Sequence, residues 1–182
     1  MKMQHKVLTA ALAVALCGLA GTVSADQYSG TDGTITINGT VVPQTCTVAN
    51  GGAVTVNLPD VLQTALATAG NTAGDTAFSI DISDCDAALG NVQALFTGGN
   101  INSTNGRLDN SGTAANVQVQ ILNGSDAVMD LSGATMSAQS QLVTTLSGGD
   151  ASIAYTARYY ANGGAAGAGD VQATVDFTLT YN

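Results

Sequence analysis

The last twelve residues of the chain, 171–182, read VQATVDFTLTYN and alternate without a break between apolar and polar side chains. This period of two is typical of a β-strand with one buried face. At about 3.3 Å per residue an unbroken strand of this length would span about 40 Å, nearly twice the usual length. Such a terminal strand is either covered on both sides or lies at an open sheet edge, where another chain can pair with it. The sequence alone leaves these two alternatives open. The residues of the apolar parity are Val171, Ala173, Val175, Phe177, Leu179 and Tyr181.

The rest of the chain repeats this alternation in shorter pieces. Segments rich in Gly, Asn, Asp and Ser separate the pieces, and only residues 60–70 leave room for a helical turn or two. Many short strands with polar turns predict an all-β fold, an antiparallel β-sandwich in a single domain. The other strand candidates are residues 53–59, 77–83, 92–96, 116–122, 141–146 and 152–160.

The first 25 residues are predicted to be a signal peptide. Lys2, His5 and Lys6 give a basic start, residues 7–16 form a short apolar run, and Val23-Ser24-Ala25 supplies the small residues that a signal peptidase requires. The apolar run is too short to span a bilayer, so we expect no permanent membrane anchor. A lipoprotein signal ending at Cys17 is disfavoured, because the preceding Leu16 is bulky.

The amino-acid composition of residues 26–182, after the predicted signal peptide, excludes most catalytic chemistry. His5 is the only histidine, and both lysines lie within the first 25 residues, so no Ser-His-Asp triad, Cys-His pair or lysine Schiff base can form after cleavage. A histidine or thiolate zinc site is excluded in the same way. After residue 25 the only basic residues are Arg107 and Arg158, against 13 acidic residues. Two arginines form no basic patch for nucleic acid. We therefore expect no enzyme, no cofactor and no nucleic-acid partner.

Cys46 and Cys85 are the two cysteines left after the signal, and they predict one disulfide formed in an oxidising compartment. Two reactive thiols would need positive neighbours, whereas Asp84 and Asp86 flank Cys85. These two aspartates and Asp81 match no calcium-loop spacing. We interpret them as solvated acids at a strand end.

Residues 33–43, GTITINGTVVP, permit two interpretations. Asn38-Gly39 could form a type I′ hairpin turn, with residues 40–42 returning as a second strand. Alternatively the whole stretch is one extended strand that stops at Pro43. The single strand would place Ile35, Ile37, Gly39 and Val41 on one face, and periodicity alone does not separate the two interpretations.

Taken in order, these features resemble the chaperone–usher fimbrial subunits, the type 1-like pilins. Each motif is weak alone, but the ordered set with its cysteine spacing is specific, and it covers essentially the whole chain after the signal. The motifs are the stretch 33–42 ahead of Cys46, VNLP (56–59), AGDTAFSIDISDC (73–85), IAYTARYYA (153–161), Gly169 at the fourteenth position from the C-terminus, and the penultimate Tyr181.

The resemblance implies an incomplete immunoglobulin-like antiparallel β-sandwich that lacks its last strand. The C-terminal strand would form one wall of an acceptor groove and would also be the strand that a chaperone binds; this wall comprises Gly169, Val171, Ala173, Val175, Phe177, Leu179 and Tyr181. Residues 26–43 would be a donor-strand extension, and residues 44–182 the pilin domain. Ile35, Ile37, Gly39 and Val41 would fill the groove of a neighbouring subunit, as in other cases of strand addition.

The partners that the resemblance implies are neighbouring subunits, a periplasmic chaperone and an outer-membrane usher. Head-to-tail strand donation does not close on itself, so it builds a homopolymeric filament. The expected role is that of a structural shaft subunit of a fimbrium that supports cell adhesion, exported through the periplasm to the surface of a Gram-negative bacterium. The alternative is a self-contained secreted β-sandwich that binds a glycan or a protein and stays monomeric.

Overall fold

The structure is a computed structural model that describes residues 35–39, 46–86 and 88–181. Residues 35–39 belong to a unit separate from the folded body and form an exposed segment without regular structure. The returning strand of the possible hairpin, residues 40–42, and with it Val41, falls outside the described part, so the choice between hairpin and single strand stays open.

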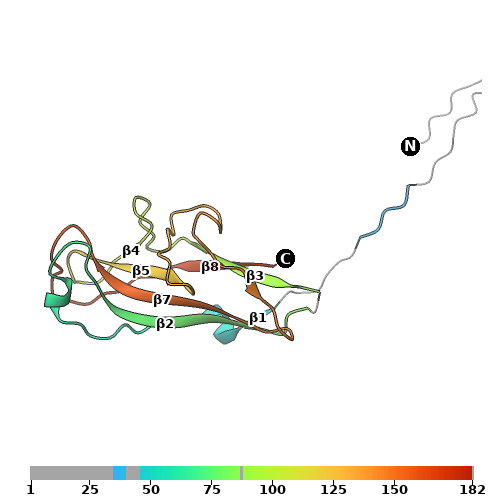
Figure 1. The fold of residues 1–182 in the computed structure, drawn as a ribbon, viewed down its shortest axis with the longest axis horizontal. Coiled ribbons are helices and arrows are strands. Elements are labelled where there is room, and N and C mark those ends of the chain that lie inside the picture. The colour runs from blue at the N-terminus through green and yellow to red at the C-terminus, as the bar shows by residue number, and fades with distance from the viewer. Residues whose placement is uncertain (1–34, 40–45, 87, 182) are drawn as a thin grey trace, which may run out of the picture. The chain divides into compact units, whose positions relative to one another are not determined.

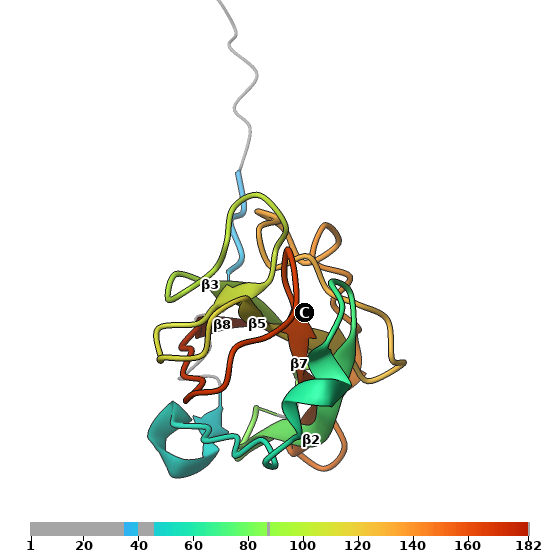
Figure 2. The ribbon, with the colours of Figure 1, turned by 90° about the vertical axis from the view of Figure 1, so that its left-hand side faces the viewer.

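The folded body consists of two antiparallel β-sheets (Figure 1). The larger sheet has the strand order β1-β2-β7-β5-β4, and the smaller sheet has the order β6-β3-β8. Figure 2 looks along the strands and shows β2 and β7 on one side and β3 and β8 on the other. The all-β prediction is therefore confirmed. The strands are β1 (Thr47–Val48), β2 (Thr72–Ser83), β3 (Asn91–Thr97), β4 (Leu108–Asp109), β5 (Val117–Asn123), β6 (Thr144–Thr145), β7 (Ala151–Ala161) and β8 (Asp176–Tyr181).

Two short 3-10 helices precede β2: η1 (Ala49–Gly52) and η2 (Gln63–Leu66). The second lies in the stretch 60–70 that left room for a helical turn, and its one buried residue is Leu66. No helix among the described residues is long and apolar enough to cross a membrane.

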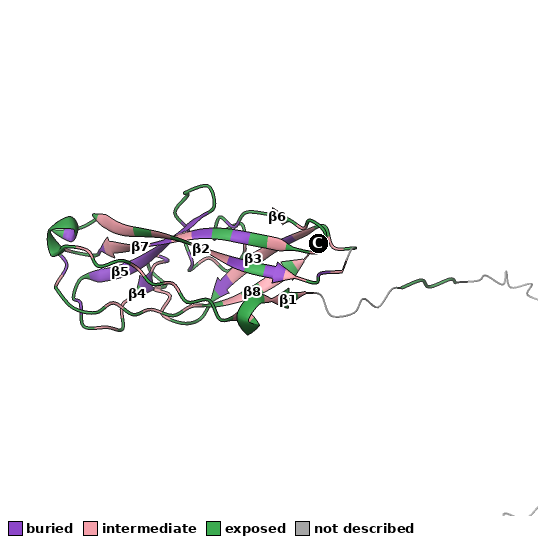
Figure 3. Ribbon diagram, turned by 90° about the horizontal axis from the view of Figure 1, so that it is seen from below, coloured by how far each residue is buried: buried purple, intermediate pink, exposed green. Residues whose placement is uncertain are grey.

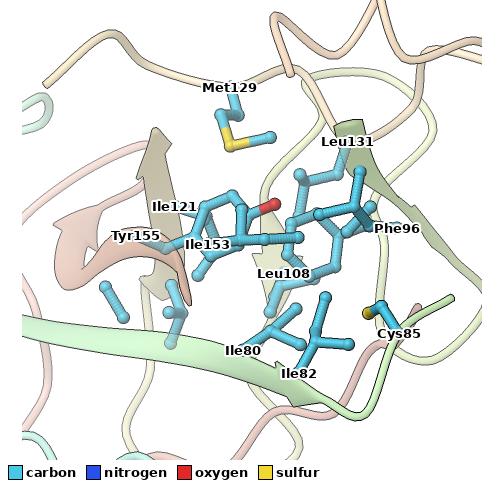
Figure 4. Close-up of a cluster of buried hydrophobic side chains, with 14 residues drawn as sticks. Ile80, Ile82, Cys85, Phe96, Leu108, Ile121, Met129, Leu131, Ile153 and Tyr155 are labelled. Atoms are coloured by element: carbon cyan, nitrogen blue, oxygen red, sulfur yellow. The ribbon is translucent and has the colours of Figure 1, made fainter. Parts of the chain in front are cut away.

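The core lies between the two sheets, and buried residues alternate with less buried ones along β3 (Figure 3). In β3 these are Val92, Ala94 and Phe96, which are buried in the same cluster as Ile80 of β2 and Tyr155 of β7. The close-up in Figure 4 shows Phe96 and Tyr155 among the aliphatic side chains of this cluster. The period of two read from the sequence therefore reports which side chains form the core.

Cys46 and Cys85 form a disulfide, as predicted. Their Cα atoms lie 4.2 Å apart, and the bond joins the residue before β1 to the end of β2, next to the pairing of Thr47 with Ser83. The disulfide therefore anchors the first described residues of the body to the larger sheet.

Three strand predictions need correction. Residues 53–59 are not a strand, because no backbone hydrogen bond pairs them with a neighbouring strand in the described chain. The stretch 141–146 contributes only the two residues of β6. The predicted long C-terminal strand is paired in a ladder only from Asp176 onward, because loop residues rather than β3 bind residues 170–174.

Candidate functional site: an open groove along β8

The C-terminal segment has one half-buried face. Along residues 171–181 every odd-numbered residue is half-buried and every even-numbered residue is exposed. The half-buried residues pack against the core cluster without being enclosed by it: Val171, Ala173, Val175, Phe177, Leu179 and Tyr181. The face that was predicted to be apolar therefore packs on the core, but the described chain covers it only in part.

The backbone groups of β8 divide between two sides. Phe96 lies opposite Phe177, and the N–H and C=O groups of Phe96 bond to the Gln139 side chain instead of to β8. The pair of Phe96 and Phe177 is therefore of the non-hydrogen-bonded type, in which the backbone groups of both residues point away from each other. It follows that the N–H and C=O of Phe177 point away from β3, toward the edge of the sheet.

The same division continues upstream of β8. The carbonyls of Asp170, Gln172 and Thr174 accept hydrogen bonds from the backbone N–H groups of Ala114, Ser111 and Asn100, at 3.0, 2.8 and 2.8 Å. Because backbone groups alternate in direction along an extended chain, those of Val171, Ala173 and Val175 point to the opposite side. That side is the same open edge, since β8 is the last strand of its sheet.

A second extended segment, residues 54–61, faces this edge. Val56 and Leu58 line a common hollow with Val171 and Val175. Within residues 46–86 and 88–181, no backbone hydrogen bond ties residues 54–61 to another segment. Two extended segments with unused backbone groups therefore lie on either side of a gap.

This gap is a groove that encloses about 410 Å³ in its central part. Its floor consists of core side chains from both sheets, so a ligand in the groove would touch the core of the sandwich directly. The floor residues are Phe78, Ile80, Phe96, Leu108, Val119, Ile121, Ala157 and Tyr159. One wall consists of Val54, Val56, Asn57 and Leu58. The other consists of the odd-numbered residues 171–177 together with Thr174.

The groove continues along the whole C-terminal segment. At one end Val48 lines a hollow together with Leu179 and Tyr181. At the other end Val61 and Leu66 line a hollow with Gly169 and Val171. The two walls therefore run in opposite directions along a groove that extends from Tyr181 to Gly169.

Gly169 begins the C-terminal wall at a point where only glycine fits. Its φ angle is 151°, and a Cβ atom there would lie 2.7 Å from the backbone N of Ala114 and from Oγ1 of Thr113. These contacts are shorter than side chains tolerate, so the glycine lets the wall approach the loop closely. The neighbouring Asp170 N–H then donates to the same Thr113 hydroxyl at 2.9 Å.

Most side chains that line the groove are apolar, and its charged groups lie at the rim. Asp60 and Asp170 border the Gly169 end, and Asp176 borders the Tyr181 end. Burial, with a smaller contribution from the charge of Asp60, raises the pKa of Tyr159, so this floor residue stays neutral to higher pH than an exposed tyrosine. No group of metal-binding side chains occurs among the described residues. The site therefore suits an apolar ligand with free backbone groups.

Neither arginine lines the groove. Arg158 lies 3.3 Å from Asp75 and donates to Gln120 at 2.9 Å, a paired surface charge. The guanidinium carbon of Arg107 lies 3.7 Å from the centre of the Tyr160 ring, an arrangement that favours a cation–π interaction.

The predicted site residues separate into two groups. Gly169 and the six apolar residues of the C-terminal wall gather along the groove. Ile35, Ile37 and Gly39 lie in the separate N-terminal unit, where the two isoleucines are 86% and 88% exposed. Val41 lies outside the described residues.

Sequence reasoning missed the floor and the second wall. Phe78, Phe96 and Ile121 were expected as strand residues, but nothing in a local pattern tells a core position that is covered from one that is left open. The signal that could have identified the second wall was residues 53–59, an alternating segment without a local partner.

Comparison with known proteins identifies the family. The sequence model of the fimbrial protein family matches residues 35–182. The major fimbrial subunit SMF-1 of Stenotrophomonas maltophilia is 41% identical over 160 residues, which cover 83% of this chain and 93% of SMF-1. The type-1 fimbrial protein A chain of Escherichia coli K12 is 34% identical over 188 residues, which cover all of both chains.

Solved structures agree on the fold. The crystal structure of the P pilus rod subunit PapA matches with a TM-score of 0.58 and 23% identity, covering 76% of this chain and 100% of PapA. A chain from a chaperone-usher pilus matches with a TM-score of 0.59 and 24% identity, covering 84% of this chain and 96% of that chain. The extent of the family match and the identity to full-length relatives show that this chain belongs to the fimbrial protein family.

Proposed function

We propose that this chain is a shaft subunit of a chaperone–usher fimbrium and polymerises by donor-strand exchange, in which a segment of one copy fills the groove of the next. The observation that carries this proposal is the open groove between residues 54–61 and β8, with apolar core side chains at its floor. On both walls, at residues 54–61 and at Val171, Ala173, Val175 and Phe177, backbone groups point to the open edge and bond to no other segment of the described chain. A β-strand supplies both an alternating set of apolar side chains and two rows of backbone donors and acceptors.

The donor that fits best is the segment 33–43 of another copy. Ile35 and Ile37 are almost fully exposed, and each would contribute about 1.5–3 kcal/mol on burial in an apolar site. In an extended strand they share a face with Gly39 and Val41. Eleven extended residues span about 36 Å, and the groove wall from residue 169 to residue 181 spans about 40 Å.

The direction of the donor explains why it must come from a second copy. Every strand pair of both sheets is antiparallel, and a donor antiparallel to β8 would place Val41, the last residue of its apolar face, at the Gly169 end. Cys46 lies two residues before Val48, which lines the Tyr181 end. The five residues from Val41 to Cys46 reach at most about 18 Å, less than half the groove length. A chain cannot donate to itself in this direction, and donation from copy to copy gives an open filament.

The remaining assignments follow from the family. Residues 1–25 serve as the signal peptide, residues 26–43 as the donor extension and residues 44–182 as the pilin domain. A periplasmic chaperone covers the groove before assembly, and an outer-membrane usher directs the exchange. The filament is displayed on the surface of a Gram-negative bacterium, and the role of the chain is structural rather than catalytic.

The test uses a chain of residues 26–182, refolded with its disulfide intact. The double variant I35D/I37D places charges on the donor face, and T36D is the matched control, because Thr36 has the opposite parity. We expect the parent and T36D to form filaments visible by electron microscopy, whereas I35D/I37D stays unassembled. A peptide of residues 26–43 should raise the melting temperature of I35D/I37D, since its own groove is intact.

Two outcomes would overturn the proposal. One is assembly of I35D/I37D at the rate of the parent. The other is a parent chain that stays monomeric and melts at the same temperature with and without the peptide, which would favour a self-contained secreted binding module.

A further inference from the structure

The side chain of Gln139 binds the backbone of a groove residue from inside the protein. Gln139 is 0% exposed. Its Oε1 accepts from the N–H of Phe96 at 3.0 Å, and its Nε2 donates to the carbonyl of Phe96 at 2.7 Å. The carboxamide therefore pairs with Phe96 as a peptide group of an adjacent strand would.

This pairing lies on the edge of β3 opposite to β8. The neighbouring strand β6 pairs only with Asn91 and Val92, so it ends before reaching Phe96. Gln139 continues the pairing with one side chain in place of a strand. The backbone of Phe96 is thereby fixed from the side that faces away from the groove.

A second branch of the same network fixes aromatic rings. Gln141 Nε2 donates to Gln139 Oε1 at 3.3 Å, and the Tyr155 hydroxyl donates to Gln141 Oε1 at 2.8 Å. The Tyr155 ring lies 5.1 Å from the ring of Phe96, edge to face, and 5.5 Å from the ring of Phe78, stacked. Phe78 and Phe96 are both floor residues of the groove.

The network is anchored in the loop that precedes β6. Gln139 Nε2 also lies 3.0 Å from the carbonyl of Leu131 and 2.9 Å from that of Gly133. Figure 4 shows Leu131 beside Phe96, and Met129 above Tyr155. A buried carboxamide that is fully hydrogen-bonded is held rigidly, because breaking any of its hydrogen bonds leaves a polar group unpaired in the core.

We propose that Gln139 is a positioning residue for strand addition: through Phe96 and Tyr155 it holds the aromatic floor of the groove in the shape that the donor strand meets. This inference rests on the proposed function. A floor held in place before binding lowers the cost of ordering side chains when the donor arrives. Without Gln139, Phe96 would move into the empty groove and would have to be displaced by the donor.

The test measures how fast a fluorescent peptide of residues 26–43 binds the I35D/I37D chain of residues 26–182. Q139M keeps the length of the side chain and removes its hydrogen bonds, and Y155F keeps the ring and removes only the hydroxyl. L122A is the matched control, because Leu122 is buried on β5 and does not line the groove. Its truncation destabilises the fold by leaving a cavity outside the groove.

We expect Q139M to slow peptide association at least about tenfold, which corresponds to about 1.4 kcal/mol. Y155F should slow it by about threefold, in keeping with the loss of one hydrogen bond. L122A should bind the peptide at a rate within about twofold of that of the I35D/I37D chain, although urea unfolds it more easily. If Q139M does not fold, the association rate of Y155F tests the positioning role of the network.

Association of Q139M or Y155F at the rate of L122A would overturn the positioning role while leaving the proposed function intact. Absence of peptide binding by the I35D/I37D chain without further substitution would overturn the proposed function, and the positioning role with it.

Discussion

Phe96 and Phe177 lie opposite each other on β3 and β8, and their backbone hydrogen-bonding groups point in opposite directions. Those of Phe96 are satisfied by Gln139 inside the protein, whereas those of Phe177 face the groove. The smaller sheet therefore has one edge closed around Phe96 by a side chain and one edge left open. An exposed strand edge invites pairing with another chain, and in the smaller sheet the edge along β8 offers backbone groups for that pairing.

Replacing Phe177 by Ala should weaken the complemented subunit more than replacing its neighbour Thr178. The Phe177 ring lines the groove, while Thr178 lies on the exposed face. We expect F177A to lower the free energy of unfolding of the peptide complex by about 3–5 kcal/mol, and T178A to change it by less than about 0.5 kcal/mol. Urea unfolding of both complexes measures this difference, and equal losses would show that Phe177 is not covered by the donor.

Loss of the disulfide should destabilise the subunit substantially. The bond between Cys46 and Cys85 closes a loop of 39 residues and ties β1 to β2, just before the wall formed by residues 54–61. We expect the double variant C46S/C85S to lose about 2–5 kcal/mol of unfolding free energy. The matched control is the parent chain in reductant, which should unfold at the same urea concentration as the double variant. A parent chain unaffected by reductant would contradict the prediction.

The features that could be predicted from sequence are those set by local alternation and by single residues. The parity of residues 171–181 gave the correct groove-facing side chains, and the composition left Cys46 and Cys85 as the only disulfide partners once the predicted signal peptide is set aside. Residues 53–59 alternate in the same way and were wrongly predicted as a strand. Alternation reports which face can be buried, whereas a strand also needs a neighbour that supplies hydrogen bonds.

The role of Gln139 could not be predicted, because it depends on contacts distant in sequence. Its neighbours within residues 137–141 (SAQSQ) are polar or small and are typical of a solvated loop. The carboxamide is nevertheless fully buried, since the loop brings it 43 residues back along the chain to Phe96. A buried glutamine has no sequence signature apart from the partners that the fold provides.

Replacing Gly169 by Ala should destabilise the start of the C-terminal wall. The φ angle of 151° is unfavourable for alanine, and its Cβ would lie 2.7 Å from the Ala114 nitrogen. We expect a loss of about 2–3 kcal/mol, from backbone strain together with a clash that the loop must move to relieve.

The control for Gly169 is G163A. Gly163 also has a positive φ, of 79°, but a Cβ there would meet nothing within 4 Å. We expect G163A to lose only about 1 kcal/mol, the part that comes from the backbone conformation. Thermal or urea unfolding of the two variants separates the clash from the strain. Equal losses would mean that the close approach of Gly169 to the loop is unimportant for stability.

Ionisation of Tyr155 should make the subunit less stable in alkaline solution. Burial raises the pKa of its hydroxyl above the ordinary value of 10.0, and the hydrogen bond to Gln141 opposes this with a smaller effect. A group whose pKa is higher in the folded state stabilises the fold fully below the pKa of the unfolded chain. That contribution is lost as pH rises, because the unfolded chain then releases a proton that the folded chain retains.

Y155F isolates this contribution because it keeps the ring and removes the ionisable hydroxyl. At pH 7 we expect Y155F to be less stable than the parent by about 1 kcal/mol, since Gln141 Oε1 loses its donor. Between pH 7 and about pH 11 the parent should lose more unfolding free energy than Y155F, and the difference between the two chains should shrink or reverse. Urea midpoints of both chains across this range measure the effect. A constant difference would show that the Tyr155 hydroxyl ionises alike in the folded and unfolded chains, and that the network from Gln139 to Tyr155 does not shield it.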